Sequence, residues 1–244
     1  MTFDVTVPVL NEAATLDRQI RILHTFLSEH FPDNSQWKIV IADNGSTDDT
    51  FAIAEKLSAE MPEVQPLRVP RRGVGLALKT SWSQSAADIV GYMDLDLATD
   101  LRHFPEAYAA IAKENYDLVY GTRLHGDAQV IGRTLKREIS SRVFNFIIKN
   151  YLNVEFSDGM CGFKWLKREH FSDLHAGGAI SDGWFFSTEL LTVAERKSLK
   201  TRELPVTWTD DAGSSKVKVL PLAMRYLREM RALRNRLKSN VFIV

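Results

Sequence analysis

The amino-acid sequence predicts an α/β fold with a mostly parallel central sheet, flanking helices and a basic amphipathic helix at the C-terminus. Two observations carry this prediction. Strand-like runs of about four to six residues alternate with helical segments of about ten to fifteen residues in the first half of the chain, as in βαβ units. Polar residues follow several of these runs, at the sheet edge where such folds bind ligands.

The first-half elements follow from local signals. Residues 3–10 form a strand-like run, and apolar residues then recur at helical spacing from Leu16 to Leu27. A β-branched run over 37–42 ends in an Asp-Asn-Gly-Ser turn signal, and Ser46 or Thr47 is expected to cap a helix over 48–61. The next expected elements are strands over 64–69, 89–93 and 118–120 and helices over 73–86 and 104–115.

The second half of the chain predicts fewer strands. Expected there are helices over 134–152, 187–196 and 220–238, a strand over 202–208 and an irregular stretch over 157–162. No repeat or low-complexity linker separates the halves. We therefore predict one domain over residues 1–215, with halves 1–121 and 122–215, followed by the helical segment 216–244.

Composition excludes several classes of protein. The 244 residues are 45% hydrophobic and 25% charged, as in ordinary globular proteins. Lys+Arg and Asp+Glu are equal at 31 each, so no nucleic-acid partner is expected. The single cysteine, Cys161, allows no intramolecular disulfide, and neither a signal peptide nor a run of 18 apolar residues occurs. A cytoplasmic location is the resulting expectation.

Four polar groups end the predicted strands. Because parallel strands share one carboxyl edge, these groups are expected to lie where a ligand binds. They are Asn11-Glu12, Asp43-Asn44, Asp94-Leu95-Asp96 and Thr122-Arg123.

Asp94 and Asp96 are candidate metal ligands. Residues two apart in an extended segment point the same way, so both carboxylates can meet one hard cation. Mg²⁺ or Mn²⁺ prefers such oxygen ligands and commonly bridges them to phosphates. Two solvated acids at a strand end are the alternative, which the polar groups on the neighbouring strands make less favourable.

Two loops could bind a nucleotide. Asp43 could accept hydrogen bonds from a base or a ribose, whereas an ordinary turn there needs no acid. Between 71 and 75, two arginines precede a Gly-Val-Gly sequence that opens a helix, so Arg72 and, one turn later, Lys79 could contact a diphosphate. A purely structural turn explains this second loop equally well.

Two helices combine basic and apolar residues. Arg123 and the helical residues Lys136, Arg137 and Arg142 are close in sequence, and apolar residues nearly surround this helix, which predicts either burial or a lipid-facing surface. The C-terminal helix has a basic face and an apolar stripe at 222, 226, 230, 233 and 237. It suits an anionic membrane or a partner helix, or it packs on the domain; the apolar end 241–244 favours the membrane.

These motifs, in this order, resemble a family 2 glycosyltransferase of GT-A fold, which has a Rossmann-like sheet. The first matching segments are 7–12, 41–48 and 93–96. Further segments resemble the dolichyl- or polyprenyl-phosphate sugar synthases, and among these the dolichyl-phosphate glucosyltransferases. They are 99–101, 121–123, 136–138, 157–158, 161–164, 183–186 and 188–191.

The resemblance implies roles for individual residues. Asp43 holds the base, and Asp94 and Asp96 hold ribose, metal and diphosphate. Arg123 and Arg137 face a lipid phosphate, and Asp158 lies close to the reacting centre. Glu189 is placed near the site without a defined role. The residues assigned to the nucleotide-sugar are Pro8, Asn11, Glu12, Asp43, Arg72, Lys79 and Asp94.

Two departures qualify the resemblance. Relatives often carry a basic residue where Val74 stands, and mannosyl-type synthases place Gln where Ala98 stands, which argues against that branch. The resulting hypothesis is a metal-assisted, inverting transfer from a UDP- or GDP-sugar to a polyprenyl phosphate, with residues 1–121 as the donor half and 122–215 as the acceptor half. The protein is expected to lie at the cytoplasmic membrane face, on the bilayer or on a membrane-spanning partner. A soluble acceptor and a non-catalytic binding module are the alternatives.

Overall fold

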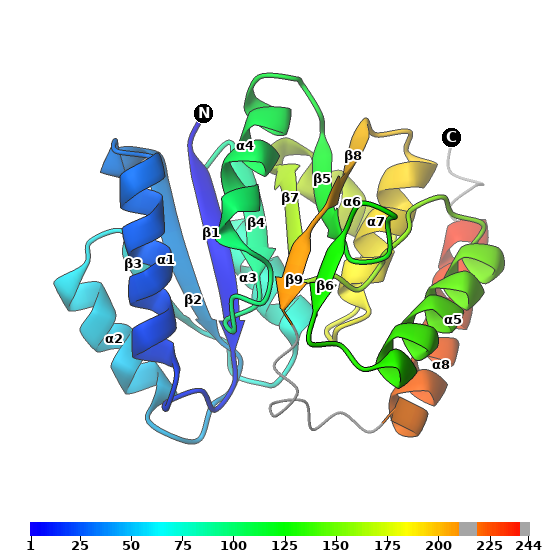
Figure 1. The fold of residues 1–244 in the computed structure, drawn as a ribbon, viewed down its shortest axis with the longest axis horizontal. Coiled ribbons are helices and arrows are strands. Elements are labelled where there is room, and N and C mark those ends of the chain that lie inside the picture. Colours follow the sequence, from blue (N-terminus) through cyan, green and yellow to red (C-terminus); the bar gives the residue numbers. More distant parts are fainter. Residues whose placement is uncertain (210–218, 240–244) are drawn as a thin grey trace.

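The computed structural model describes residues 1–209 and 219–239, and its centre is a seven-stranded sheet (Figure 1). β7 is antiparallel to both of its neighbours, and the other adjacent strands of this sheet pair in parallel. The strand order is β3 (Val64–Arg68), β2 (Trp37–Asp43), β1 (Phe3–Val9), β4 (Ile89–Met93), β7 (Phe163–Lys167), β5 (Leu118–Thr122) and β8 (Thr201–Pro205).

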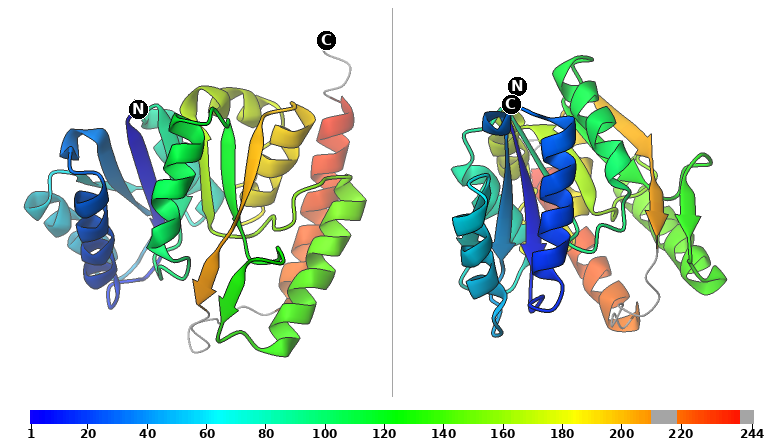
Figure 2. Two further views of the ribbon diagram at one scale, coloured as in Figure 1. Left: turned by 45° about the horizontal axis from the view of Figure 1, so that its top comes forward. Right: turned by 60° about the vertical axis from the view of Figure 1, so that its left-hand side comes forward.

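Helices cover both faces of the sheet, and a small parallel sheet lies beside it (Figure 2). The α-helices are α1 (Leu16–His30), α2 (Thr50–Glu60), α3 (Val74–Gln84), α4 (Phe104–Ala112), α5 (Leu135–Leu152), α6 (Phe171–Ala176), α7 (Phe186–Arg196) and α8 (Val219–Ser239). The small sheet pairs β6 (Gln129–Ile131) with β9 (Thr207–Thr209), and short 3-10 helices cover Asn34–Gln36, Leu101–His103 and Arg168–His170.

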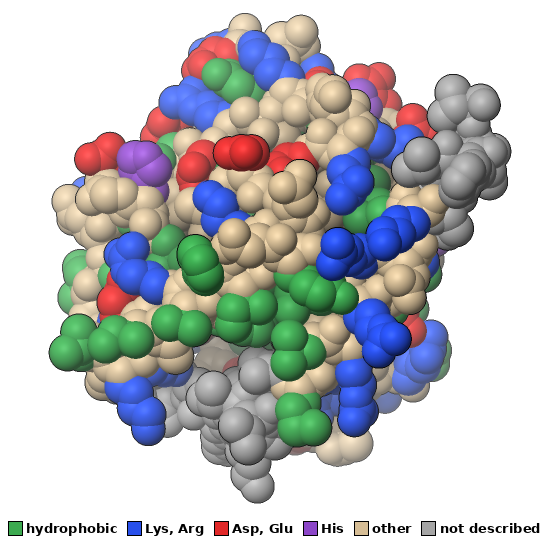
Figure 3. Space-filling view, turned by 90° about the vertical axis from the view of Figure 1, so that its right-hand side faces the viewer, with side chains coloured by type: hydrophobic (Ala, Val, Ile, Leu, Met, Phe, Trp, Pro, Cys, Tyr) green, Lys and Arg blue, Asp and Glu red, His purple; other side chains and the backbone are tan. Residues whose placement is uncertain are grey.

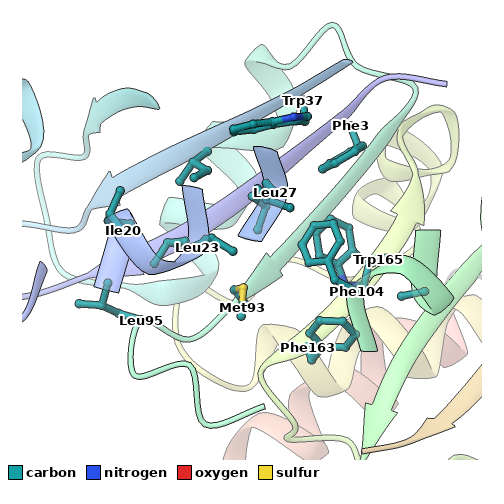
Figure 4. Close-up of a cluster of buried hydrophobic side chains, with 14 of the residues drawn as sticks. Phe3, Ile20, Leu23, Leu27, Trp37, Met93, Leu95, Phe104, Phe163 and Trp165 are labelled. Atoms are coloured by element: carbon teal, nitrogen blue, oxygen red, sulfur yellow. The ribbon is translucent and has the colours of Figure 1, made fainter. Parts of the chain in front are cut away.

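Two hydrophobic cores lie on opposite faces of the sheet because side chains alternate along each strand. In β4, Ile89 and Met93 join the core under α1, α2 and α4, whereas Val90 and Tyr92 join the core under α3, α6 and α7. The first core contains a cluster of aromatic rings, in which those of Phe104 and Trp165 lie 4.3 Å apart, centroid to centroid (Figure 4). This packing fixes the sheet, whose carboxyl edge carries the polar residues.

The α/β prediction is confirmed, and three local predictions are corrected. Strand β7 was missed because Lys164 and Lys167 interrupt the apolar run expected of a central strand. The strand expected over 202–208 is two strands, β8 and β9, in different sheets. Helix α2 begins at Thr50 after Asp49. Ser46 and Thr47 therefore do not cap this helix, and they bind Asn11 in the β1–α1 loop.

Helices α5 and α8 pack against each other at one end of the molecule (Figure 1), with the rings of Phe144 and Tyr226 5.2 Å apart. The apolar stripe of α8 is buried against the second core from Tyr226 to Leu237, so this stripe is not available to a membrane. The side chain of Leu222, residues 241–244 and the 215/216 boundary lie outside the described part of the chain. None of the helices in the described part has the length and the apolar composition that a bilayer span requires.

Candidate functional site

The ends of β1, β2 and β4 bring one set of polar residues together, which we call the carboxylate edge: Asn11, Glu12, Asp43, Asp94 and Asp96. β1 pairs in parallel with both β2 and β4, so these predicted residues follow adjacent strands at one edge. Asn11 adopts a left-handed conformation (φ 55°), and its side-chain oxygen accepts the N–H of Thr47 at 2.8 Å. The Glu12 N–H donates to the Thr50 hydroxyl at 2.8 Å. Pro8 lies within β1, opposite Ala42.

Asp43, the last residue of β2, is buried with only half of its carboxylate satisfied. Oδ1 accepts the N–H of Ser46 at 2.9 Å. Oδ2 is buried and has no hydrogen-bond partner among the described residues. Because a buried carboxylate oxygen is costly to leave unpaired, this atom is suited to accept a ligand N–H or O–H.

Asp94 and Asp96 differ in their surroundings. Asp94 packs so closely on Gly162 that a Cβ there would lie 1.9 Å from Oδ2 of Asp94. Burial, with the neighbouring Asp96 charge, raises the pKa of Asp94 to about 7. Asp96 is exposed, and its Oδ1 accepts the Ala98 N–H at 3.0 Å.

The carboxylate pair fits a divalent cation that is completed by other ligands. Residues 1–209 and 219–239 contain no cluster of three or more His, Cys, Asp or Glu side chains that could hold a metal. Mg²⁺ and Mn²⁺ sites commonly use one or two carboxylates together with substrate phosphates. The mutual repulsion of Asp94 and Asp96, which contributes to the raised pKa of Asp94, is what a shared cation relieves.

The loop before α3 is held by a second loop. Cβ atoms on Gly73 and Gly75 would lie 2.5 Å from the Asp182 carbonyl and 2.3 Å from the Ser181 carbonyl, so close backbone packing requires both glycines. Asp182 pairs with Arg71 at 2.7 Å and with Lys79 at 2.9 Å. Lys79 is therefore engaged in the fold, whereas Arg72 is exposed.

Glu189, for which the resemblance gave no role, holds that second loop, residues 180–182, in place. Its buried carboxylate accepts the N–H groups of Ile180 at 2.8 Å and Ser181 at 2.6 Å and also pairs with Arg236 of α8. The carboxylate therefore ties α7, α8 and the loop together as a structural support.

Beyond the end of β5 lies a cavity of about 380 Å³, which we call the arginine cavity. Arg123, Arg133 and Arg142 line it together with a single acid, Glu138. The guanidinium carbons of Arg123 and Arg133 lie 5.3 Å and 5.8 Å from the ring centroid of Trp208. Glu138 pairs with both Arg133 and Arg142, and Asp158 pairs with Arg123, so three guanidinium groups meet two carboxylates. The remaining excess of positive charge makes this cavity suited to an anion such as phosphate.

Asp158 holds Arg123 in place. The Arg123 Nε and Nη2 atoms donate to the two Asp158 oxygens at 2.8 Å and 3.1 Å, and the Met160 N–H donates to Asp158 at 3.0 Å. Burial raises the pKa of Asp158, but the charge and hydrogen bonds of Arg123 outweigh it and lower the pKa to about 2. Asp158 is therefore ionised and fully engaged, which makes it a poor proton acceptor.

Lys164 of β7 is a buried cation between the two regions. Its Nζ donates to the Cys161 carbonyl at 2.6 Å, and its charge acts on both Asp94 and Asp158. Burial lowers the pKa of Lys164 to about 8 and raises that of the Cys161 thiol to about 11. A buried neutral thiol is unreactive, so Cys161 has a structural role.

The structure places the sequence candidates in two groups and adds new residues. Arg123 links the groups, because it lines the cavity and its charge also limits the rise in the pKa of Asp94. Arg137 does not line the cavity, although Arg142 does. Sequence reasoning missed Arg133, Trp208 and Lys164; Arg133 precedes the predicted helix in the same basic stretch, which was the available signal.

Comparison with known proteins relates this chain to sugar transferases. The family model of "Glycosyl transferase family 2" matches residues 4–174. The chain is 33% identical over 214 residues to Glycosyltransferase AglD of Haloferax volcanii, covering 87% of this chain and 34% of that protein. It is 27% identical over 232 residues to the dolichyl-phosphate beta-glucosyltransferase of Saccharomyces cerevisiae, covering 86% and 67%. The chain thus spans about a third of the first relative and about two thirds of the second.

Solved structures share the fold. Glucosyl-3-phosphoglycerate synthase from Mycobacterium tuberculosis, in complex with Mn²⁺, UDP-glucose and phosphoglyceric acid, superposes with a TM-score of 0.64 at 21% identity. The match covers 97% of this chain and 80% of that one. At this identity the likeness establishes the α/β architecture of the GT-A glycosyltransferases.

Proposed function

The chain belongs to glycosyl transferase family 2, and we propose that it transfers a sugar from a UDP- or GDP-linked donor to a polyprenyl or dolichyl phosphate with inversion at the anomeric carbon. The observation that carries the proposal is the arginine cavity beside Asp158, whose carboxylate is engaged by Arg123 and cannot serve as a base. An acceptor bound there must bring its own negative charge.

The carboxylate edge is the proposed donor site. The unpartnered Oδ2 of Asp43 is suited to a base N–H, and Asn11 and Glu12 hold the loop that carries Asp43's partner Ser46. Asp94 and Asp96 would hold Mg²⁺ or Mn²⁺, which when bound offsets the charge of a diphosphate leaving group. Arg72 is the exposed cation on the neighbouring loop that can approach the diphosphate.

The arginine cavity is the proposed site of the acceptor phosphate. Arg123, Arg133 and Arg142 offer donors in the planar geometry that phosphate oxygens accept. Because Arg123 is fixed by Asp158, it can orient the phosphate without rearranging. Two relatives, in Trichomonas vaginalis (27% identical) and Saccharomyces cerevisiae, carry the name dolichyl-phosphate beta-glucosyltransferase, which supports a lipid phosphate and a glucosyl donor.

The proposed reaction is a direct displacement. A phosphate oxygen of the acceptor attacks the anomeric carbon, the bond from that carbon to the donor diphosphate breaks, and the electron pair leaves with the nucleoside diphosphate. A phosphate is already ionised at neutral pH, so no side chain has to remove a proton. Asp158, with a pKa of about 2, then acts by positioning Arg123.

The test is transfer from labelled UDP- and GDP-sugars to polyprenyl phosphate in detergent, with Mg²⁺ or Mn²⁺. We expect label in the lipid phase, its loss with EDTA, and a loss of about 100-fold or more in Asp96→Asn. Asp96 is exposed, so the Asp96→Asn variant is expected to unfold at the wild-type temperature. Asp17→Asn makes the same change on α1, outside the carboxylate edge, and as the matched control it should transfer sugar like wild type.

Two outcomes would contradict the proposal. Labelling of a soluble phosphorylated or glycan acceptor, with no lipid labelled, would leave a glycosyltransferase with a different acceptor. Binding of a nucleotide-sugar by calorimetry, with no transfer to any acceptor, would indicate a non-catalytic binding module.

A further inference from the structure

The outer face of α5 exposes a band of large apolar side chains. Among the side chains that the structure describes, in residues 1–209 and 224–238, seven of the twelve exposed large hydrophobic ones belong to α5 and α8. Leu135 is 74% exposed and Phe146 67% exposed. The members on α5 recur at helical spacing along one face, and two more lie on α8. They are Leu135, Ile139, Val143, Phe146 and Ile147, with Met224 and Leu227.

Basic side chains border this apolar band. Figure 3 shows hydrophobic side chains gathered across this face, with Lys and Arg beside them. Lys136 and Arg142 on α5 are exposed, whereas the acids Glu138 and Glu229 are only partly so. The exposed basic residues of α8 are Arg225, Arg228, Arg231, Arg234 and Lys238. An apolar face with a cationic border complements a bilayer that contains anionic lipids.

The apolar band and the arginine cavity are continuous. Leu135 lines the cavity and is also the first exposed apolar residue of α5. Arg142 likewise lines the cavity and lies next to Val143 of the band. An anion-binding cavity therefore opens at the edge of an apolar surface, an arrangement that matches a charged headgroup joined to a hydrocarbon chain.

We propose that the outer face of α5, together with Met224 and Leu227 of α8, is a docking surface for an anionic lipid bilayer. The inference rests on the proposed function, because a lipid-borne acceptor explains why the cavity opens at this face. It also assigns the membrane contact to a different surface from the one that the sequence predicted. The stripe of α8 that suggested a membrane is packed inside, and the exposed apolar surface belongs mainly to α5.

The experiment measures binding to vesicles that contain neither acceptor nor nucleotide. Wild-type protein is floated with phosphatidylcholine vesicles and with vesicles containing phosphatidylglycerol, at low and high salt. We expect binding to the anionic vesicles that weakens with salt, and at least about tenfold weaker binding in the double variant Ile139→Glu/Phe146→Glu. Replacing exposed Arg228 and Arg231 by Gln should weaken binding to anionic vesicles by about tenfold or more.

Matched controls separate docking from folding and from catalysis. Ile22→Glu makes one substitution of the same kind at an exposed site on α1, at the other end of the molecule (Figure 1), and should bind like wild type. Each variant is checked for wild-type thermal unfolding. Transfer to polyprenyl phosphate in detergent is measured separately, so a failure of the proposed function shows as no wild-type transfer whatever the vesicles do.

Two results would overturn the docking surface. One is wild-type protein that does not float with anionic vesicles, or a double variant that floats equally well. The other is a wild-type dimer by light scattering that the double variant converts to monomer while neither binds vesicles, which would assign the face to a second copy of the chain.

Discussion

At the carboxylate edge, main-chain N–H groups hold the polar side chains, whereas at the arginine cavity carboxylates hold guanidinium groups. Asp43 and Asp96 accept the N–H groups of Ser46 and Ala98, both close in sequence. Arg123 instead depends on Asp158, 35 residues further along the chain. Asp43 and Asp96 are thus held within their own strand-turn segments, whereas the Arg123–Asp158 charge pair forms only when distant segments meet.

This difference has an energetic consequence. A carboxylate that accepts local N–H groups keeps its partners whenever its turn forms, so a change there mainly alters ligand binding. A buried ion pair leaves an uncompensated charge when one partner is removed. We therefore expect changes at the arginine cavity to affect folding and changes at the carboxylate edge to affect activity.

The largest expected effect is that of Asp158→Asn. Asp158 is fully buried and Arg123 is nearly so, and the variant leaves the guanidinium charge unbalanced. We expect the free energy of unfolding in urea to fall by about 3–5 kcal/mol. The control is Asp17→Asn on the exposed face of α1. Arg21 donates to both oxygens of Asp17, at 3.0 Å and 3.1 Å, so this variant removes a bidentate pair of the same kind. Equal destabilisation of the two variants would contradict the contrast between the regions.

Lys164 lies between the two regions, and its charge is tested by how the free energy of unfolding depends on pH. Its pKa falls from 10.5 to about 8 on folding because burial disfavours its charge. Between these two values the unfolded chain binds one more proton, so wild-type stability should rise with pH, by up to about 3 kcal/mol relative to Lys164→Met. Urea unfolding of both proteins from pH 7 to 10.5 measures this. A constant difference across that range would show that Lys164 stays charged in the fold.

The smallest expected effect concerns the carboxylate edge. Gly162→Ala places a Cβ against Asp94, whose carboxylate must then move, and we expect transfer to fall by about 100-fold while most of the stability is retained. A double-mutant cycle with Asp94→Ala provides the control. If the added methyl acts through Asp94, Gly162→Ala should lower transfer little further when Asp94 is already replaced by alanine. An equal loss in both backgrounds would point to general disruption of β7.

The sequence alone determined much of the structure of residues 1–121. Its strands, helices and strand-end acids follow from local periodicity and turn chemistry, and the parallel sheet brings those acids to one edge. The family resemblance, drawn from motifs such as 93–96, is confirmed by the match over residues 4–174. The roles of individual residues, including Arg137 and Glu12, stay predictions.

For the rest of the chain, only the tertiary structure showed where the strands lie and which helix faces are exposed. β7 was hidden because a lysine occupies a buried strand position, and that burial is possible only where Asp94, Asp158 and the Cys161 carbonyl surround the charge. Which face of α5 is exposed and which stripe of α8 is buried likewise depends on how the two helices meet the second core. Amphipathic periodicity identifies an apolar face, but the surface that covers it is a property of segments distant in sequence.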